Sequence, residues 1–282
     1  DQAVMWPHVE RRQMINVQGR FLSDYEFHEM VMQAWKSESP TFNSPFQLDE
    51  SYIVKCQSQL EVVGLPPEAW FVALHTRNVA RDEFRSTNPM VFRKAIEAIL
   101  AAGGYVVHFG TRDEITDLSA SPRYINLTRR GMLLSHTHPY LISAARLFLT
   151  SQSGPQHLAT IFGTDTVVVD AVALGRNTVS SSGNIAYLPR VPVDTSGVPV
   201  PLVEILSSKM AYAEPETQSA FAKKFGYRLR QTSEEEIYQA AQCRLNVVKE
   251  SSELQGVHDE IDRLRHHHGA VSFGPISGAF LK

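Results

Sequence analysis

The chain has 282 residues, of which 43% are hydrophobic, and a formal net charge of -3. This length allows one large domain or two small ones with a proper core, and so small a charge gives no sign of a nucleic-acid or acidic-membrane partner. The sequence has two distant cysteines, Cys56 and Cys243, which predict a reduced protein, with one disulfide as the alternative. It has no apolar run near the roughly 18 residues of a membrane span and no signal peptide, so we expect a cytoplasmic protein.

Residues 1–47 form an N-terminal segment in our interpretation, and residues 48–282 form the main domain. Apolar residues at helical spacing over 23–38, with Ser23 as the N-cap, predict a helix in the first segment. The Pro, Ser and Asn content of 39–45 is typical of a linker. The chain begins with Asp rather than Met, which fits a piece of a longer protein.

The main domain begins with a predicted helix over 49–63 and then changes rhythm. Short apolar runs are typical of buried strands at 70–77, 105–110, 123–127, 146–151 and 165–170. Helical patterns lie between them at 88–104, 138–145 and 155–163. Strands that are apolar on both faces and alternate with helices predict a parallel sheet. The expected fold class is therefore α/β and Rossmann-like, with helices on both faces of the sheet.

The chain after this sheet is harder to interpret. Residues 170–206 are rich in Gly, Ser, Pro and Val, which predicts loops with short strands. Helical patterns return from Thr217, and the clearest one begins after Thr232 or Ser233, either of which would cap it before an acidic first turn. Three consecutive histidines at 266–268 fit a basic helix end better than a metal site.

The stretch TSQSGPQHLATIFGT, from 150 to 164, joins a predicted strand to a predicted helix through small and hydroxyl residues. Such a turn places N–H groups and the positive end of a helix at the carboxyl edge of a parallel sheet, where anions bind. Ser151 and Ser153 add hydroxyls, Gly154 allows close backbone approach, and His157 lies near the first turn. The alternative is an ordinary turn in which Ser153 caps the helix and Pro155 starts it.

Polar residues also follow the first two strands of the predicted sheet. His75 and Arg77 end the first strand, and the guanidinium fork of an arginine makes two parallel hydrogen bonds to a phosphate. The alternative for Arg77 is an ordinary surface side chain. The second strand is followed by a glycine and three polar residues, Gly110, Thr111, Arg112 and Asp113. Because these ends share one edge of the sheet, together they favour a ligand site.

Other motifs are weak or missing. Ser135, His136 and His138 precede a helix and could line the same cleft, although capping or surface roles are commoner for such residues. We find no dinucleotide-binding glycine fingerprint, no phosphate loop and no nucleophile elbow. No convincing metal-ligand spacing is present either, so we expect neither a metal nor a cofactor.

The stretches WFVALHTRN, NPMVFRKAIEAILAAGGYVVHFGTRDE, RYINL and LFLTSQSGPQHLATIFGTDTVVVD together resemble the C-terminal half of a GT-B glycosyltransferase. The resemblance is to a family of proposed bacterial glycosyltransferases of surface-polysaccharide loci. More distantly, the chain is similar to heptosyltransferases and to fucosyltransferases with a His-x-Arg motif. The resemblance covers the chain from about Leu48 to Leu245.

This resemblance implies that a nucleoside-diphosphate sugar, the donor, binds in this half. Arg77, with His75 beside it, would be catalytic and would meet the diphosphate. Ser151, Ser153, Gly154, Pro155 and His157 would bind the donor at the helix start. The turn from Gly110 through Thr111, Arg112 and Asp113 would lie near the nucleoside. The chain departs from the related motifs at Gln152 and from Asn78 onward, so the nucleotide and the sugar stay open.

The same resemblance shapes the expected reaction. A sugar would pass from the donor to a hydroxyl of a glycan, lipid or protein, with inversion, because the paired glutamates of retaining GT-B enzymes are not evident. No metal is needed if an arginine and backbone N–H groups neutralise the diphosphate. Residues 1–47 would be a remnant or edge of an acceptor domain, with the rest in an additional N-terminal domain or a partner chain. The alternatives are a nucleotide-sugar epimerase and a non-catalytic domain that binds a glycan or a partner.

Overall fold

The computed structural model describes residues 14–17, 20–23, 47–77, 86–110, 120–128, 135–172, 184–212 and 217–245, together with Ile115 and Leu118. Near the N-terminus, β1 (Met14–Val17) and β2 (Arg20–Ser23) pair in an antiparallel hairpin. We did not predict this hairpin from the sequence. The helix and linker expected after Ser23 lie outside the described residues.

The main domain is built on one six-stranded parallel sheet with the strand order β5-β4-β3-β6-β7-β8. The strands are β3 (Phe71–Thr76), β4 (Tyr105–Gly110), β5 (Tyr124–Asn126), β6 (Leu147–Ser151), β7 (Thr166–Ala171) and β8 (Ile185–Pro189). From β3 the chain moves outward to β5, returns to the other side of β3 as β6, and continues to β8. This is the doubly wound order of a Rossmann-like fold, and it reverses between β3 and β6.

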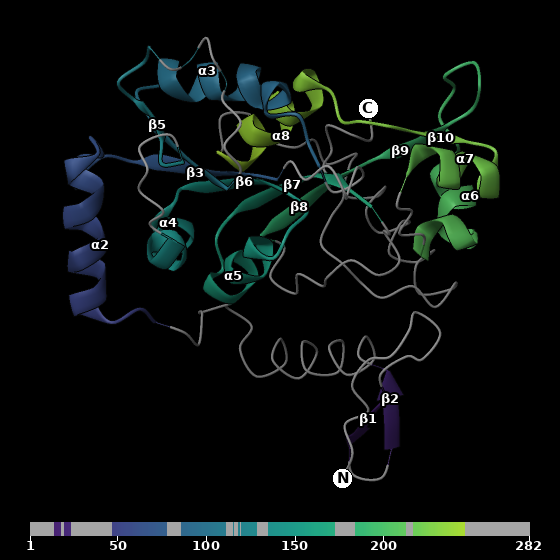
Figure 1. The fold of residues 1–282 in the computed structure, drawn as a ribbon, viewed down its shortest axis with the longest axis horizontal. Helices are drawn as coiled ribbons and strands as arrows, with labels where there is room; N and C mark the ends of the chain where they lie inside the picture. The colour runs from purple at the N-terminus through teal and green to yellow at the C-terminus, as the bar shows by residue number, and fades with distance from the viewer. Residues whose placement is uncertain are drawn as a thin grey trace.

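Helices cover both faces of the sheet, as expected (Figure 1). One face packs on α3 (Arg93–Ala101) and α8 (Glu234–Arg244), and the other on α2 (Glu50–Val62), α4 (His138–Ala144) and α5 (Pro155–Phe162). Alternate residues of β3 explain the two layers, since Val72 and Leu74 join the first core and Phe71 and Ala73 join the second. The apolar runs of the strands are therefore buried on both sides.

The helices begin where their capping residues predict. Asp49 caps α2, and Ser233 rather than Thr232 caps α8, in a capping box with Glu236. Asn88 caps a 3₁₀ turn, η2 (Pro89–Phe92), which runs into α3. The single helix expected over 88–104 thus opens as 3₁₀ helix, a form common at helix starts.

The segment expected to hold loops and short strands, 170–206, does contain short strands where it is described. Its strand β8 belongs to the main sheet, and β9 (Val191–Val193) pairs antiparallel with β10 (Arg228–Arg230). Beside them lie α6 (Leu202–Ser207), the 3₁₀ turn η5 (Lys209–Tyr212) and α7 (Gln218–Phe225), which share a third core with β7 and β8 (Figure 1). No helix in the described part of the chain is long and apolar enough to cross a bilayer.

Candidate functional site

The two sequence motifs meet where the strand order reverses, at the carboxyl ends of β3 and β6. The backbone N–H of Arg77 donates to Ser151 Oγ at 3.1 Å. Two residues before Arg77, on β3, His75 Nδ1 lies 3.1 Å from Ser153 Oγ. In doubly wound sheets, ligands bind in the crevice outside this reversal point. The structure therefore brings four of the predicted site residues together at the place where such folds bind ligands.

Ser153 does not cap α5, so the ordinary-turn alternative is wrong on this point. The N-cap position is Gly154, and the helix has no side-chain cap. The Ser153 hydroxyl turns instead to the His75 ring, and the Ser153 N–H points to Gln156 Oε1 at 3.4 Å. The Ser153 hydroxyl thus links the turn after β6 to β3, at the carboxyl edge of the sheet.

The start of α5 offers fewer N–H groups than the sequence suggests. The N–H groups of Gln156 and His157 donate to Ser153 O at 3.2 Å and to Gly154 O at 3.0 Å, and Pro155 has none. An anion here would be held chiefly by the N–H of Gly154 and by surrounding side chains. Gly154 is exposed and has helical dihedrals, and an added Cβ would meet nothing within 4 Å, so neither its backbone nor its neighbours require a glycine.

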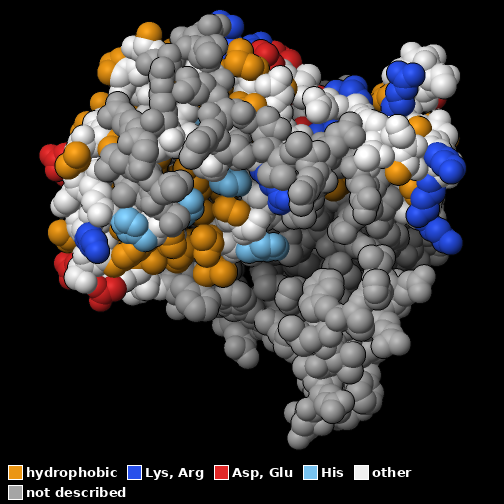
Figure 2. Space-filling view, viewed as in Figure 1, with side chains coloured by type: hydrophobic (Ala, Val, Ile, Leu, Met, Phe, Trp, Pro, Cys, Tyr) orange, Lys and Arg blue, Asp and Glu red, His pale blue; other side chains and the backbone are white. Residues whose placement is uncertain are grey.

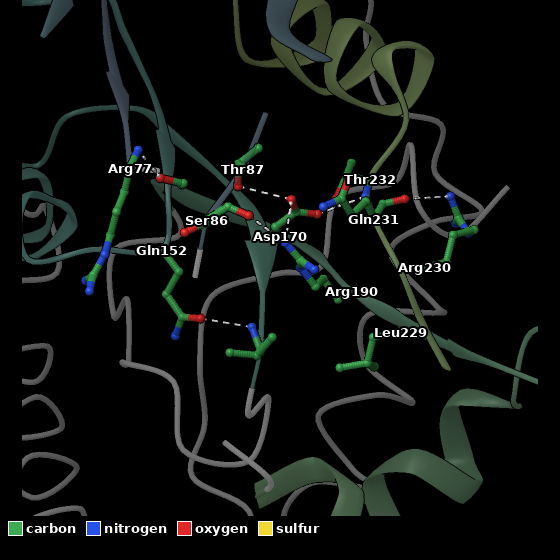
Figure 3. A network of polar contacts seen from close by, with 12 residues as sticks. Arg77, Ser86, Thr87, Gln152, Asp170, Arg190, Leu229, Arg230, Gln231 and Thr232 are labelled. Atoms are coloured by element: carbon green, nitrogen blue, oxygen red, sulfur yellow. Dashed lines mark hydrogen bonds and ion pairs between the residues drawn. The ribbon is translucent and has the colours of Figure 1, made fainter. Parts of the chain in front are cut away.

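Arg77 is held firmly by its backbone. Besides the bond from its N–H to Ser151, its carbonyl accepts from the N–H of Thr87 at 3.0 Å. Figure 3 shows the Arg77 side chain running in the same direction as that of Gln152, away from Asp170. Gln152 is in turn fixed by a 2.9 Å bond from the N–H of Val172 to its Oε1. The guanidinium therefore extends from a fixed backbone beside a fixed amide.

His75 is a neutral histidine in a confined position. Burial lowers its pKa to about 3, and nearby positive charges, first that of His138, add to the effect. Its Nε2 faces Gly110, where an added Cβ would lie 3.1 Å from Nε2 and 2.3 Å from Thr76 O. Gly110 also has a φ of +113°, which favours glycine. The predicted tight turn at Gly110 therefore also makes room for the imidazole.

His136, before α4, and His138, its first residue, differ in position. The ring of Phe109 lies between His75 and His138, with ring centroids 5.3 Å and 4.5 Å apart. Burial lowers the pKa of His138 as well. His136 instead lies in the 3₁₀ turn η4 (Ser135–Thr137). It contacts α2 through a 2.8 Å hydrogen bond between its Nε2 and Gln59 Oε1. His138 thus packs on the Phe109 ring that also contacts His75, whereas His136 holds the turn η4 against α2.

Sequence analysis missed a buried carboxylate at the same edge. Asp170, near the end of β7, accepts from Thr87 Oγ1 at 3.0 Å and from Arg190 Nη2 at 3.4 Å through Oδ2 (Figure 3). Its Oδ1 accepts from the N–H of Thr232 at 2.8 Å. The Asp170 and Arg190 side chains are 2% and 1% exposed. An acidic residue at the end of the apolar run TVVVD was the available signal.

A second buried polar side chain, His108, links the strands on the other side of β3. His108 on β4 lies 2.7 Å from Thr76 Oγ1 through Nε2 and 2.7 Å from the Tyr124 hydroxyl through Nδ1. Burial lowers its pKa to about 4, so this ring is neutral at pH 7. Because Thr76 and His75 point to opposite faces of β3, His108 supports the strand ends from the side away from Ser153.

The remaining residues that the sequence singled out are only partly described. Thr111, Arg112, Asp113 and the histidines at 266–268 lie outside the described residues. His157 is exposed on the first turn of α5. In the described ranges no three His, Cys, Asp or Glu side chains gather closely enough to hold a metal ion. Figure 2 shows histidine side chains near one another on the face of the molecule in view, with a Lys or Arg side chain beside them.

Comparison with known proteins gives faint similarities. No protein-family model and no curated protein matches the chain. Among solved structures, it is similar to the glycosyl transferase family 9 from Veillonella parvula DSM 2008, at 14% identity and a TM-score of 0.45, over 72% of this chain and 54% of that chain. It is also similar to the beta Kdo 2,7 transferase KpsC of Thermosulfurimonas dismutans, at 12% identity and a TM-score of 0.23, over 52% of this chain and 46% of that chain.

The chain thus spans about half the length of both structures, and similarities of this size assign it to no family. The strand order and the two helical layers nevertheless define its architecture directly. The main domain has an α/β, Rossmann-like fold with a polar cluster at its reversal point.

Proposed function

We propose that this chain is the donor-binding half of a GT-B glycosyltransferase and binds a nucleoside-diphosphate sugar at the reversal point. The observation that carries the proposal is the meeting of His75 and Arg77, at the end of β3, with Ser151 and Ser153, at the end of β6. The start of α5, at Gly154, is part of the same edge. The motif resemblance to GT-B enzymes points to the same edge and the same ligand.

The proposed reaction is a single displacement. A hydroxyl of a glycan, lipid or protein attacks the anomeric carbon, the bond from that carbon to the diphosphate oxygen breaks, and its electron pair leaves with the diphosphate. Arg77 and the N–H of Gly154 stabilise the negative charge that grows on this oxygen, which is the electrostatic role that dominates such catalysis. These groups neutralise the charge without a metal ion or another cofactor.

Inversion fits the carboxylate at this edge. Both oxygens of Asp170 accept hydrogen bonds, from Thr87, Arg190 and Thr232. A carboxylate engaged in this way is poorly placed to form a covalent bond with a sugar. The base that takes the proton of the acceptor hydroxyl would come from the acceptor-binding part, of which residues 1–47 form a remnant or edge.

His75 would orient the donor rather than supply charge. At pH 7 its ring is neutral, so it has one N–H donor and one acceptor nitrogen. Because Nδ1 contacts the Ser153 hydroxyl and Nε2 faces Gly110, the ring would act by holding Ser153 in place at the edge of the sheet. The positive charge at this site then comes from Arg77, Gly154 N–H and the helix end.

The proposal is tested by binding and by transfer. The purified chain is titrated with ADP, CDP, GDP and UDP and then incubated with radiolabelled sugar derivatives of the one that binds. We expect Arg77→Ala to weaken binding strongly and Arg146→Ala to leave it unchanged. Arg146 is a matched control because it precedes β6 at the opposite edge and lies over the Trp70 ring, 5.1 Å from its centroid.

Transfer or hydrolysis of the sugar would support a glycosyltransferase, whereas a changed sugar on an intact nucleotide would show an epimerase. Binding without any turnover, even after an acceptor-binding part is supplied, would leave a non-catalytic domain. If none of these nucleotides binds, or if Arg146→Ala weakens binding as much as Arg77→Ala does, the proposed site is wrong.

A further inference from the structure

The connection between β3 and α3 is fixed at both of its described ends. At its start, the carbonyl of Arg77 accepts from the N–H of Thr87 at 3.0 Å. At its end, the carbonyl of Ser86 accepts from Arg190 Nη2 at 2.7 Å. Residues 78–85 lie outside the described residues. The backbone position of Arg77 therefore depends on residues that follow it by about ten positions.

Thr87 is itself held by a rigid carboxylate. Its hydroxyl donates to Asp170 Oδ2 at 3.0 Å, and its side chain is almost fully buried. Asp170 cannot easily turn away, because Arg190 and the N–H of Thr232 donate to its two oxygens (Figure 3). Three segments that are distant from Asp170 in the sequence thus converge on its side chain.

The backbone of Asp170 adds a second sign of constraint. Its φ is +55°, and among the described residues no other non-glycine residue has a positive φ. The pairing of β7 with β8 also shifts in register between Val169 and Ala171, on either side of it. A non-glycine residue in the left-handed region is strained, and it persists where its surroundings hold it, commonly near functional sites. The strand end is therefore shaped so that this carboxylate reaches Thr87.

We propose that Asp170 and Thr87 form a positioning pair for Arg77, an inference that rests on the proposed function for its role in donor binding. The contacts run from Asp170 Oδ2 to the Thr87 hydroxyl, from the Thr87 N–H to the Arg77 carbonyl, and from the Arg77 N–H to Ser151. The pair touches no ligand itself. It fixes Arg77, the residue directly after β3, and with it the direction in which the guanidinium fork leaves the sheet.

The test compares three variants in the whole chain. Thr87→Val removes the hydroxyl and keeps the shape, and Thr87→Ser keeps the hydroxyl. Thr166→Val is the matched control, because Thr166 is also fully buried and donates to Thr164 O at 2.8 Å, at the amino end of β7. Both valine variants lose one buried hydrogen bond, so a general loss of stability affects them alike.

Two measurements are made on each variant after a thermal melt shows that it is folded. The first is hydrogen–deuterium exchange at the N–H groups of Arg77 and Thr87, which needs no ligand. The second is calorimetric titration with the nucleoside diphosphate that the wild-type chain binds. We expect Thr87→Val to speed exchange at both N–H groups and to weaken binding roughly tenfold, the scale seen when a group that orients a ligand-binding side chain is removed.

Thr87→Ser should restore both properties, and Thr166→Val should change neither. Unchanged exchange and affinity in Thr87→Val would overturn the proposal, as would an equal loss in Thr166→Val. Failure of the wild-type chain to bind any nucleoside diphosphate would refute the proposed function alone. Exchange at Arg77 would then still decide whether Asp170 and Thr87 hold this residue in place.

Discussion

Replacing Asp170 with asparagine tests the buried polar cluster at its centre. The substitution keeps the size of the side chain, and asparagine tolerates the positive φ of this position, so the change is mainly one of charge and hydrogen bonding. Three donors face the two carboxylate oxygens, from Thr87, Arg190 and Thr232. The new NH₂ group must face at least one of them.

The expected cost follows from this geometry. Asp170→Asn removes the negative charge beside the Arg190 guanidinium, and that side chain is 1% exposed. Breaking a buried ion pair from one side costs about 3 to 5 kcal/mol, a large part of the usual 5 to 15 kcal/mol of a domain. The double variant Asp170→Asn, Arg190→Met should recover part of the loss, because it no longer buries an isolated charge.

Urea unfolding, followed by tryptophan fluorescence and circular dichroism, measures the loss. Asp165→Asn, directly before the same strand, is the matched control: its carboxylate is 46% exposed, lies 3.5 Å from Arg244, and should contribute below about 1 kcal/mol. If Asp170→Asn costs no more than Asp165→Asn, the cluster does not stabilise the domain in the way described here.

Further predictions concern the site, the metal and the pH dependence. Arg77→Ala should weaken binding of the nucleoside diphosphate by about 2 to 4 kcal/mol in calorimetry, and Arg77→Lys should restore only part of it, because a point charge does not replace a fork. Transfer should survive EDTA, and Asp113→Asn should alter donor preference without metal dependence; activity lost with EDTA and restored by Mg²⁺ or Mn²⁺ would contradict this. Because burial lowers the pKa of His108 to about 4, the unfolded chain binds more protons between pH 6.5 and 4. The free energy of unfolding should fall there as the pH falls, and His108→Phe should reduce the slope by up to about 1.4 kcal/mol per pH unit. Gly110→Ala should lower the melting temperature strongly and Gly154→Ala should not, since only the first has a positive φ and a Cβ that would lie within 3 Å of a backbone atom.

The sheet could be predicted from the sequence because its strands are apolar on both faces. The runs VVVD and LFLT are buried in β7 and β6, and the helical patterns between them form the two outer layers. Carboxyl ends of parallel strands share an edge, so polar residues that end different strands could be expected to meet. This reasoning found His75, Arg77 and Ser153 without knowledge of the strand order.

Other features of the fold and of the site could not be predicted from the sequence, for physical reasons. The sequence does not show that Ser153 contacts His75 instead of capping α5, since both need only a hydroxyl at that position. Asp170 looked like the end of a strand, and its role depends on Thr87 and Arg190, which are distant in the sequence. The composition of 170–206 predicted short strands but not which of them joins the main sheet, because β8 is only five residues long and ends in proline.

The central claim is that a nucleoside diphosphate binds at the reversal point between β3 and β6. Backbone amide NMR of the isotope-labelled chain, recorded while each nucleoside diphosphate is added, tests it most directly. We expect the largest shift changes at Arg77, Ser153 and Gly154, saturating together. Saturable changes confined to other residues, such as Arg146 at the opposite edge of the sheet, would contradict the claim.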